Sequence, residues 1–85
     1  METKISVMIT DPSDQFRDTL RTQLDAESDL EIVAEAKDGN EALPLLAEWR
    51  PDFLLTELLM PNLDGMGLLR RMGEASPDTK TIIIT

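Results

Sequence analysis

Four short apolar runs alternate along the chain with longer segments in which apolar residues recur every three or four positions. The runs lie at 5–9, 30–36, 52–57 and 80–85. Runs of this length, rich in Ile, Val, Leu or Phe, predict β-strands, and the longer spacing between them predicts amphipathic helices. The resulting order, β-α-β-α-β-α-β, predicts a parallel sheet whose crossover connections are right-handed.

The first predicted helix runs from Ser13 to about Ala26. Either Ser13 or Asp14 can cap the unpaired backbone N–H groups at its start. The residues that recur every four positions, and that we expect on its buried side, are Phe16, Leu20 and Leu24. Of the two neighbours Phe16 and Arg17, the phenylalanine is therefore predicted to lie in the core and the arginine on the surface.

The second and third predicted helices also have recognisable starts. The second spans 38–49 and contains Pro44, which removes a backbone donor and predicts a slight kink near the end of the first turn. Asp64 is placed to cap the third helix. The buried side of that helix is predicted to carry Met66, Leu69 and Met72.

The third apolar run predicts a strand at the centre of the sheet. Phe53, Leu54 and Leu55 are adjacent, so both faces of this strand are apolar. Burial on both faces is typical of a parallel sheet that is covered by helices on each side. With 85 residues and neither an internal repeat nor a linker, the chain is long enough for one domain, residues 1–85.

Composition narrows the classes of function. Eight basic and seventeen acidic residues give a net charge of -9, which disfavours direct binding of nucleic acid by this chain. The absence of Cys and His excludes disulfides and the usual zinc ligands. Because no apolar run approaches the roughly 20 residues of a membrane helix and no leader precedes the first strand, we expect a soluble, cytoplasmic protein without a membrane partner.

Two acids follow predicted strands. Asp11 closes the first and Glu57 closes the third. Ligand chemistry in open parallel sheets gathers at the carboxyl ends of strands, so neighbouring first and third strands would bring both acids to one crevice. Two carboxylates there could hold Mg²⁺ or take part in phosphoryl chemistry. The alternative is that both acids only cap turns or solvate loops.

Four blocks of the sequence resemble successive parts of a response-regulator receiver domain of two-component signalling. They are VMITDPSDQFRDTL, EAKDGNEAL, RPDFLLTELLMPNLDG and TIIIT, in the order and at the spacing of the family. The resemblance covers essentially the whole chain and is strongest for the branch linked to helix-turn-helix transcription factors. It implies a flavodoxin-like fold with strand order 2-1-3-4-5 and helices on both faces of the sheet. It also implies an incomplete receiver, about two thirds of the fold, that lacks the last helix, strand and helix.

The resemblance assigns roles to individual positions. Glu57 stands where the family has its phosphate-accepting aspartate. Asp11 matches the first residue of the family's acidic pair, but Pro12 replaces the second, which is a direct Mg²⁺ ligand in the family. Leu59 matches the residue whose backbone carbonyl completes that metal site, and Thr85 matches the hydroxyl residue that contacts the phosphoryl group. The lysine of the family's fifth strand has no counterpart.

These departures matter because phosphoryl transfer requires an aligned acceptor and cations that neutralise the transferred charge. The extra methylene of Glu57 displaces the carboxylate by about one carbon–carbon bond, and a misplacement of about 1 Å can cost on the order of a hundredfold in rate. Mg²⁺ binding is expected to be weak or lost. We therefore expect an atypical, phosphorylation-independent module that regulates transcription through protein contacts and is not an enzyme. The alternatives are a Mg²⁺-dependent receiver with residual phosphorylation at Glu57, and a fragment without activity of its own.

The fourth predicted strand bears on the partners. Ile82, Ile83 and Ile84 alternate between the two faces, so both faces require cover. We expect an exposed apolar patch and an unpaired edge, covered by a second copy in a homo-oligomer or by the remainder of a longer protein, unless the strand is simply frayed. The resemblance also implies a sensor histidine kinase as a protein partner.

Overall fold

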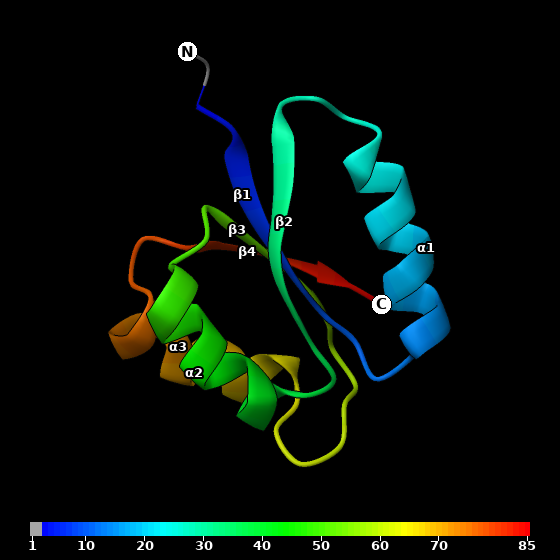
Figure 1. Ribbon diagram of the computed structural model, residues 1–85. Helices are drawn as coiled ribbons and strands as arrows, with labels where there is room; N and C mark the ends of the chain where they lie inside the picture. The colour runs from blue at the N-terminus through cyan, green and yellow to red at the C-terminus, as the bar shows by residue number, and fades with distance from the viewer. Residues whose placement is uncertain (1–2) are drawn as a thin grey trace.

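A parallel sheet with helices on both faces forms the framework of the protein (Figure 1). The computed structural model describes residues 3–85, and its four strands lie in the order β2-β1-β3-β4 with every neighbouring pair parallel. This is the predicted flavodoxin-like arrangement without its final helix, strand and helix. The elements are β1 (Ile5–Thr10), α1 (Asp14–Asp25), β2 (Leu30–Ala36), α2 (Gly39–Trp49), β3 (Phe53–Glu57), α3 (Gly65–Ala75) and β4 (Lys80–Ile84).

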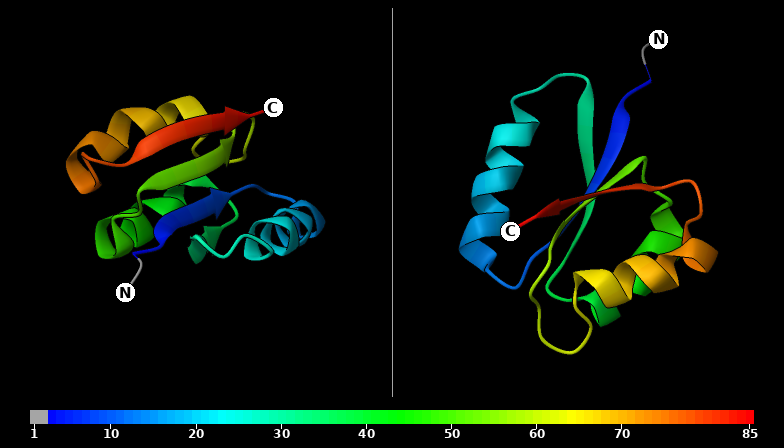
Figure 2. Two further views of the ribbon diagram at one scale, coloured as in Figure 1. Left: turned by 90° about the horizontal axis from the view of Figure 1, so that it is seen from above. Right: turned by 180° about the vertical axis from the view of Figure 1, so that it is seen from behind.

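The helices divide unequally between the two faces of the sheet. Figure 2 shows α1 on one side and the adjacent helices α2 and α3 on the other. The main core lies beneath α2 and α3, where β1 and β3 contribute Met8 and Leu54 and the helices contribute Leu46 and Leu68, all fully buried. The central position predicted for the third strand is confirmed, because β3 lies between β1 and β4.

Side-chain caps set the starts of all three helices of the described region. Ser13 Oγ accepts a hydrogen bond of 3.1 Å from the Phe16 N–H, so Ser13, the first of the two predicted candidates, caps α1. Asp64 caps α3 as predicted, through a 2.8 Å bond from the Gly67 N–H. Pro44 lies inside α2, which continues to Trp49, so the proline removes a donor without ending the helix.

The buried side of α3 differs from the prediction. Met72 is buried, but Met66 and Leu69 are 42% and 40% exposed, and Leu68 is fully buried in their place. Leu68 and Met72 are four positions apart and therefore share one side of the helix, which packs on the core. Residues three positions apart do not stay on one side of an α-helix, which has 3.6 residues per turn. Of the three predicted residues, Met66 and Leu69 therefore point away from the core, and only Met72 faces it.

The prediction for Phe16 and Arg17 is wrong in both parts. Phe16 as a whole residue is 40% exposed, whereas the side chain of Arg17 is only 12% exposed. Helix α1 has no fully buried residue and packs against β2, where Arg17 and Arg21 both contact Glu35. The aliphatic stem of an arginine can cover apolar surface while its charged end finds a partner. Helices α2 and α3 are attached to the sheet through buried apolar side chains. Helix α1 is attached in part through ion pairs with β2.

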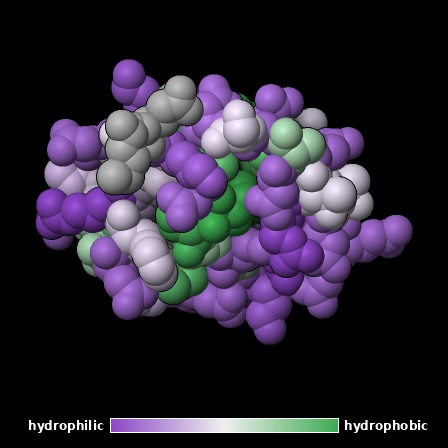
Figure 3. Space-filling view, turned by 45° about the horizontal axis from the view of Figure 1, so that its top comes forward, coloured by the Kyte–Doolittle hydropathy of each residue, from purple (hydrophilic) through white to green (hydrophobic). Residues whose placement is uncertain are grey.

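The predicted exposure of the fourth strand is confirmed. Ile82 and Ile83 are 47% and 37% exposed although they point to opposite faces of β4. Apolar side chains also reach the surface in the middle of the face drawn in Figure 3, where hydrophilic residues enclose them. Over residues 3–85, no helix combines the length and the apolar character that crossing a membrane requires.

Candidate functional site

The register of the sheet brings the predicted site residues to one edge. Thr10 of β1 pairs with Thr56 of β3, and each is followed directly by a predicted site acid. Glu57 pairs in turn with Ile84 of β4, which precedes the predicted phosphoryl-contact residue. Because the strands are parallel, their carboxyl ends meet at this edge and place there Asp11, Glu57 and Thr85. Their placement is the predicted one, and their roles stay predictions.

Asp11 is buried, and one of its carboxylate oxygens and both of its backbone polar groups form hydrogen bonds. Its Oδ1 accepts a hydrogen bond of 2.8 Å from the Ser13 N–H, and its carbonyl oxygen accepts one from the Arg17 guanidinium. Its own N–H donates to the Ala36 carbonyl oxygen over 3.1 Å. These contacts fix the turn from β1 into α1. One oxygen of the carboxylate therefore caps this turn.

Glu57 is half-buried, and its carboxylate turns back onto its own loop. Its Oε1 accepts a hydrogen bond of 3.3 Å from the Leu59 N–H. Its carbonyl oxygen accepts one of 3.0 Å from the Thr56 hydroxyl. A Cβ atom at Gly65 would lie 2.7 Å from that same carbonyl oxygen, so only glycine permits α3 to begin this close to the strand. The acid is held by local backbone contacts.

The loop between β3 and α3 is fastened at both of its sides. The Gly65 N–H donates to the Leu58 carbonyl oxygen over 2.8 Å, which closes the base of the loop. On the far side, the Gly39 N–H donates to the Leu63 carbonyl oxygen over 3.0 Å, and the Asn62 amide donates to an Asp38 carboxylate oxygen over 2.9 Å. The loop that carries Leu59 is thereby attached to the start of α2.

Sequence reasoning missed this attachment. It predicted only that the second helix begins at residue 38, and Asp38 does cap α2. A Cβ at Gly39 would lie 2.6 Å from the Leu63 carbonyl oxygen, so glycine is required by a contact with a distant part of the chain. The Asp-Gly pair was a visible signal, but nothing local identified its partner.

The electrostatics of Asp38 reflect the same attachment. The Glu41 N–H, which donates to Asp38 Oδ1 over 2.9 Å, is the main cause that lowers the pKa of the Asp38 carboxyl from its usual value. The Asn62 amide lowers this pKa further, and the Asn40 N–H and the charge of Lys37 add to the effect. A hydrogen bond to the ionised form stabilises that form, which is the physical reason for the direction.

The residues at the sheet edge fit Mg²⁺ poorly. Pro12 offers no side-chain oxygen, and the two carboxylates, of Asp11 and Glu57, each accept a backbone N–H. Within residues 3–85, no three acidic, His or Cys side chains gather closely enough to hold a metal ion. Magnesium requires near-octahedral oxygen ligands, and the carbonyl of Leu59 is the only further ligand that the resemblance suggests.

Comparisons with known proteins agree on one family. A family model described as the response regulator receiver domain matches residues 7–85. The Transcriptional regulatory protein DegU of Brevibacillus brevis is 31% identical over 84 residues, which are 99% of this chain and 36% of that protein. Protein-glutamate methylesterase/protein-glutamine glutaminase 5 of Myxococcus xanthus is 37% identical over 81 residues, 95% of this chain and 23% of that protein.

A solved structure gives the same result for the fold. The signal receiver domain of the response regulator NarL from Mycobacterium tuberculosis matches with a TM-score of 0.89 at 27% sequence identity. The match covers 95% of this chain and 65% of that one. The chain thus spans about a quarter to a third of the two curated relatives, and about two thirds of a solved receiver.

Proposed function

The chain belongs to the response-regulator receiver family, and we propose that it is an atypical receiver that signals through protein contacts without being phosphorylated. The output that we propose is transcription, by analogy with relatives such as DegU, through a DNA-binding part outside residues 1–85. The proposal rests on the residues at the sheet edge. They keep the negative charge of the family's acceptor position, but Pro12 replaces one of the family's metal ligands.

One contact carries the proposal, the hydrogen bond from the Leu59 N–H to the Glu57 carboxylate. It ties one oxygen of the carboxylate to the backbone of the loop that follows β3. Phosphoryl transfer depends on alignment and on cations that neutralise charge, and Pro12 removes one metal ligand. A glutamate at this position presents a constant negative charge further from the backbone than an aspartate does. In the proposed function, this charge takes the place of a phosphorylated aspartate.

Intact-mass analysis after incubation with acetyl phosphate and Mg²⁺ tests the proposal. No phosphoryl adduct is expected, either on the natural chain or on a Glu57→Gln control. An adduct that forms on the natural chain and disappears in Glu57→Gln would overturn the proposal in favour of the alternative, a Mg²⁺-dependent receiver with Glu57 as a working acceptor.

A rescue experiment tests the assignment of positions separately. The double substitution Pro12→Asp with Glu57→Asp, made in a chain extended through the family's fifth strand, should create Mg²⁺ binding that calorimetry detects. The same double variant should accept phosphate from acetyl phosphate. If it gains neither property, the assignment of Asp11, Pro12 and Glu57 to the family's positions is wrong.

For partners, we propose a sensor histidine kinase or another signalling protein, and a second copy of the chain at β4. The support for self-association is the exposure of Ile82 and Ile83 on a strand whose outer edge has no neighbour among residues 3–85. Such an edge can pair with another strand. Light scattering over a concentration series should show a dimer that Ile82→Lys disrupts. A monomer at all concentrations would contradict this part of the proposal.

A further inference from the structure

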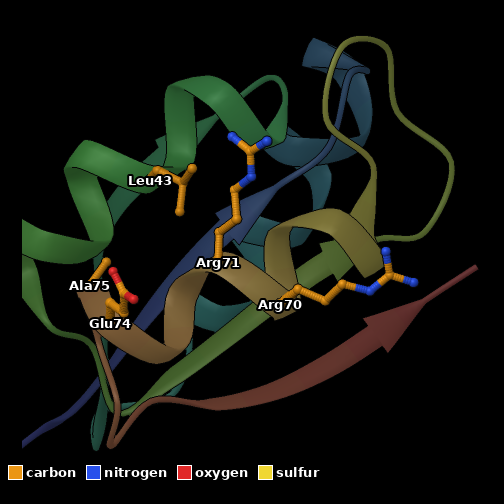
Figure 4. A pocket seen from close by; sticks show the side chains of 5 residues that line it. All are labelled: Leu43, Arg70, Arg71, Glu74 and Ala75. Carbon is orange, nitrogen blue, oxygen red and sulfur yellow. The ribbon is translucent and has the colours of Figure 1, made fainter.

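A groove of about 510 Å³ lies between α2 and α3, on the helical face that carries the main core. It is lined by Leu43, Arg70, Arg71, Glu74 and Ala75. Figure 4 shows the Arg71 side chain extended toward α2 beside Leu43, the Arg70 side chain directed the other way, and Glu74 with Ala75 at the far end. Leu43 and Ala75 are half-buried, whereas both arginines are exposed. The groove therefore combines an apolar floor with the guanidinium group of Arg71, while Arg70 lines it and directs its own exposed guanidinium group away from Leu43.

In the part of the chain that the structure describes, the two arginines differ from those of α1 in having no ionic partner. Arg17 and Arg21 contact carboxylates, including that of Glu35. Within residues 3–85, no carboxylate lies within ion-pair distance of Arg70 or Arg71. This is notable because seventeen acidic residues are available and only eight are basic. Glu74 lies one helical turn beyond Arg70, yet the two side chains form no ion pair, as Figure 4 illustrates.

We propose that this groove binds an acidic peptide segment of a partner protein. The planar guanidinium group donates two parallel hydrogen bonds to a carboxylate, which makes unpaired arginines suited to acidic side chains. Leu43 and Ala75 would receive an apolar side chain of the same segment. The size of the groove lies within the usual range of about 300–1,000 Å³ for ligand sites.

The charge of the whole chain favours a short acidic peptide over a polyanion. A net charge of -9 repels nucleic acid over its whole length, whereas a peptide with a few carboxylates can meet the local positive charge. The inference goes beyond the proposed function, because none of the groove residues belongs to the edge that carries Glu57. It holds whether or not Glu57 accepts phosphate.

Fluorescence anisotropy with a labelled peptide of alternating Leu and Glu tests the inference. The double variant Arg70→Ser/Arg71→Ser should bind about tenfold more weakly or worse, since each lost charged contact at an interface is costly. The matched control is Lys4→Ser/Lys80→Ser, which also removes two positive charges but at the amino ends of the strands. The control should bind within about twofold of the natural chain, as expected for a screened distant charge.

Two further measurements separate a groove from a general charge effect. Arg70→Lys/Arg71→Lys keeps the charge and the helix, so it remains informative if the serine variant fails to fold, and it should bind several-fold more weakly because the planar fork is lost. Leu43→Ala should also weaken binding.

Equal losses in the arginine-to-serine variant and the Lys4/Lys80 control would overturn the inference, as would equal binding of a Leu-Lys peptide. Self-association that the arginine substitutions abolish would overturn it too, because the groove would then join copies of this chain.

Discussion

The side-chain amide of Asn62 donates a 2.9 Å hydrogen bond to the carboxylate of Asp38, across 24 positions of sequence. Asp38 also caps α2, so one carboxylate holds both a helix start and the loop that follows β3. Asn62 itself has a φ of 69°, in the left-handed region that asparagine tolerates better than most residues. The environment of Glu57 is therefore fixed in part from the neighbouring helix.

Two substitutions of Asn62 separate its hydrogen bond from its backbone conformation. Asn62→Gly keeps the left-handed conformation and loses the amide, and should lower the free energy of unfolding by about 0.5–1.5 kcal/mol. Asn62→Ala also strains the backbone and should lower it by about a further 1–2 kcal/mol. Urea denaturation measures both. Equal stability of the two variants would show that the left-handed conformation is not maintained in solution.

The lowered pKa of Asp38 predicts how stability depends on pH. An acid with a lowered folded-state pKa stabilises the fold fully above its unfolded pKa, about 3.9, and this contribution is lost as the pH falls through the lower folded value. Asp38→Asn can still cap α2 but carries no charge. Its stability relative to the natural chain should be lowest at about pH 5 and above, and should recover as the pH falls below about 4. A difference that stays constant from pH 5 to pH 2 would contradict the assignment.

The neighbours Leu68 and Leu69 predict opposite results on α3. Leu68 is fully buried in the main core, so Leu68→Ala should lower the free energy of unfolding by about 2–5 kcal/mol. Leu69 is largely at the surface, so Leu69→Ala should change it by less than about 1 kcal/mol. Both substitutions introduce alanine into the same helix, so helix propensity cancels. Similar losses would mean that α3 is rotated relative to the sheet.

The attachment of α1 should depend on salt. Glu35 contacts both Arg17 and Arg21, and α1 has no fully buried residue. Glu35→Gln should lower the free energy of local opening of α1 by about 1 kcal/mol. The backbone amides of α1 should then exchange about fivefold faster. Raising the salt concentration to 1 M, where the Debye length is about 3 Å, should also speed amide exchange in α1, because salt screens these ion pairs.

The control for α1 is Asp18→Asn. Asp18 contacts Arg21 from the exposed surface of the same helix, and exposed pairs of this kind contribute little. Hydrogen exchange in α1 should therefore hardly change in this variant. If Asp18→Asn accelerates exchange as much as Glu35→Gln does, the pairs within α1 are more important than those that join α1 to β2.

Local patterns in the sequence determined the elements and their order. The second predicted strand, 30–36, coincides with β2, and the predicted caps Ser13 and Asp64 start α1 and α3. Strand periodicity and capping depend on neighbours within a few residues, so a single sequence contains them. The alternation of strands and helices also placed Asp11 and Glu57 at the same edge, because parallel strands end together.

Only the tertiary structure decided which side of each helix is buried and which distant groups meet. The choice between Leu68 and Leu69, and between Phe16 and Arg17, depends on how a helix rotates against the sheet and on what lies opposite. The bond from Asn62 to Asp38 joins two loops whose approach follows from the packing of α3 beside α2. Periodicity specifies that a helix has a buried side, but long-range packing and charge pairing select the residues that occupy it.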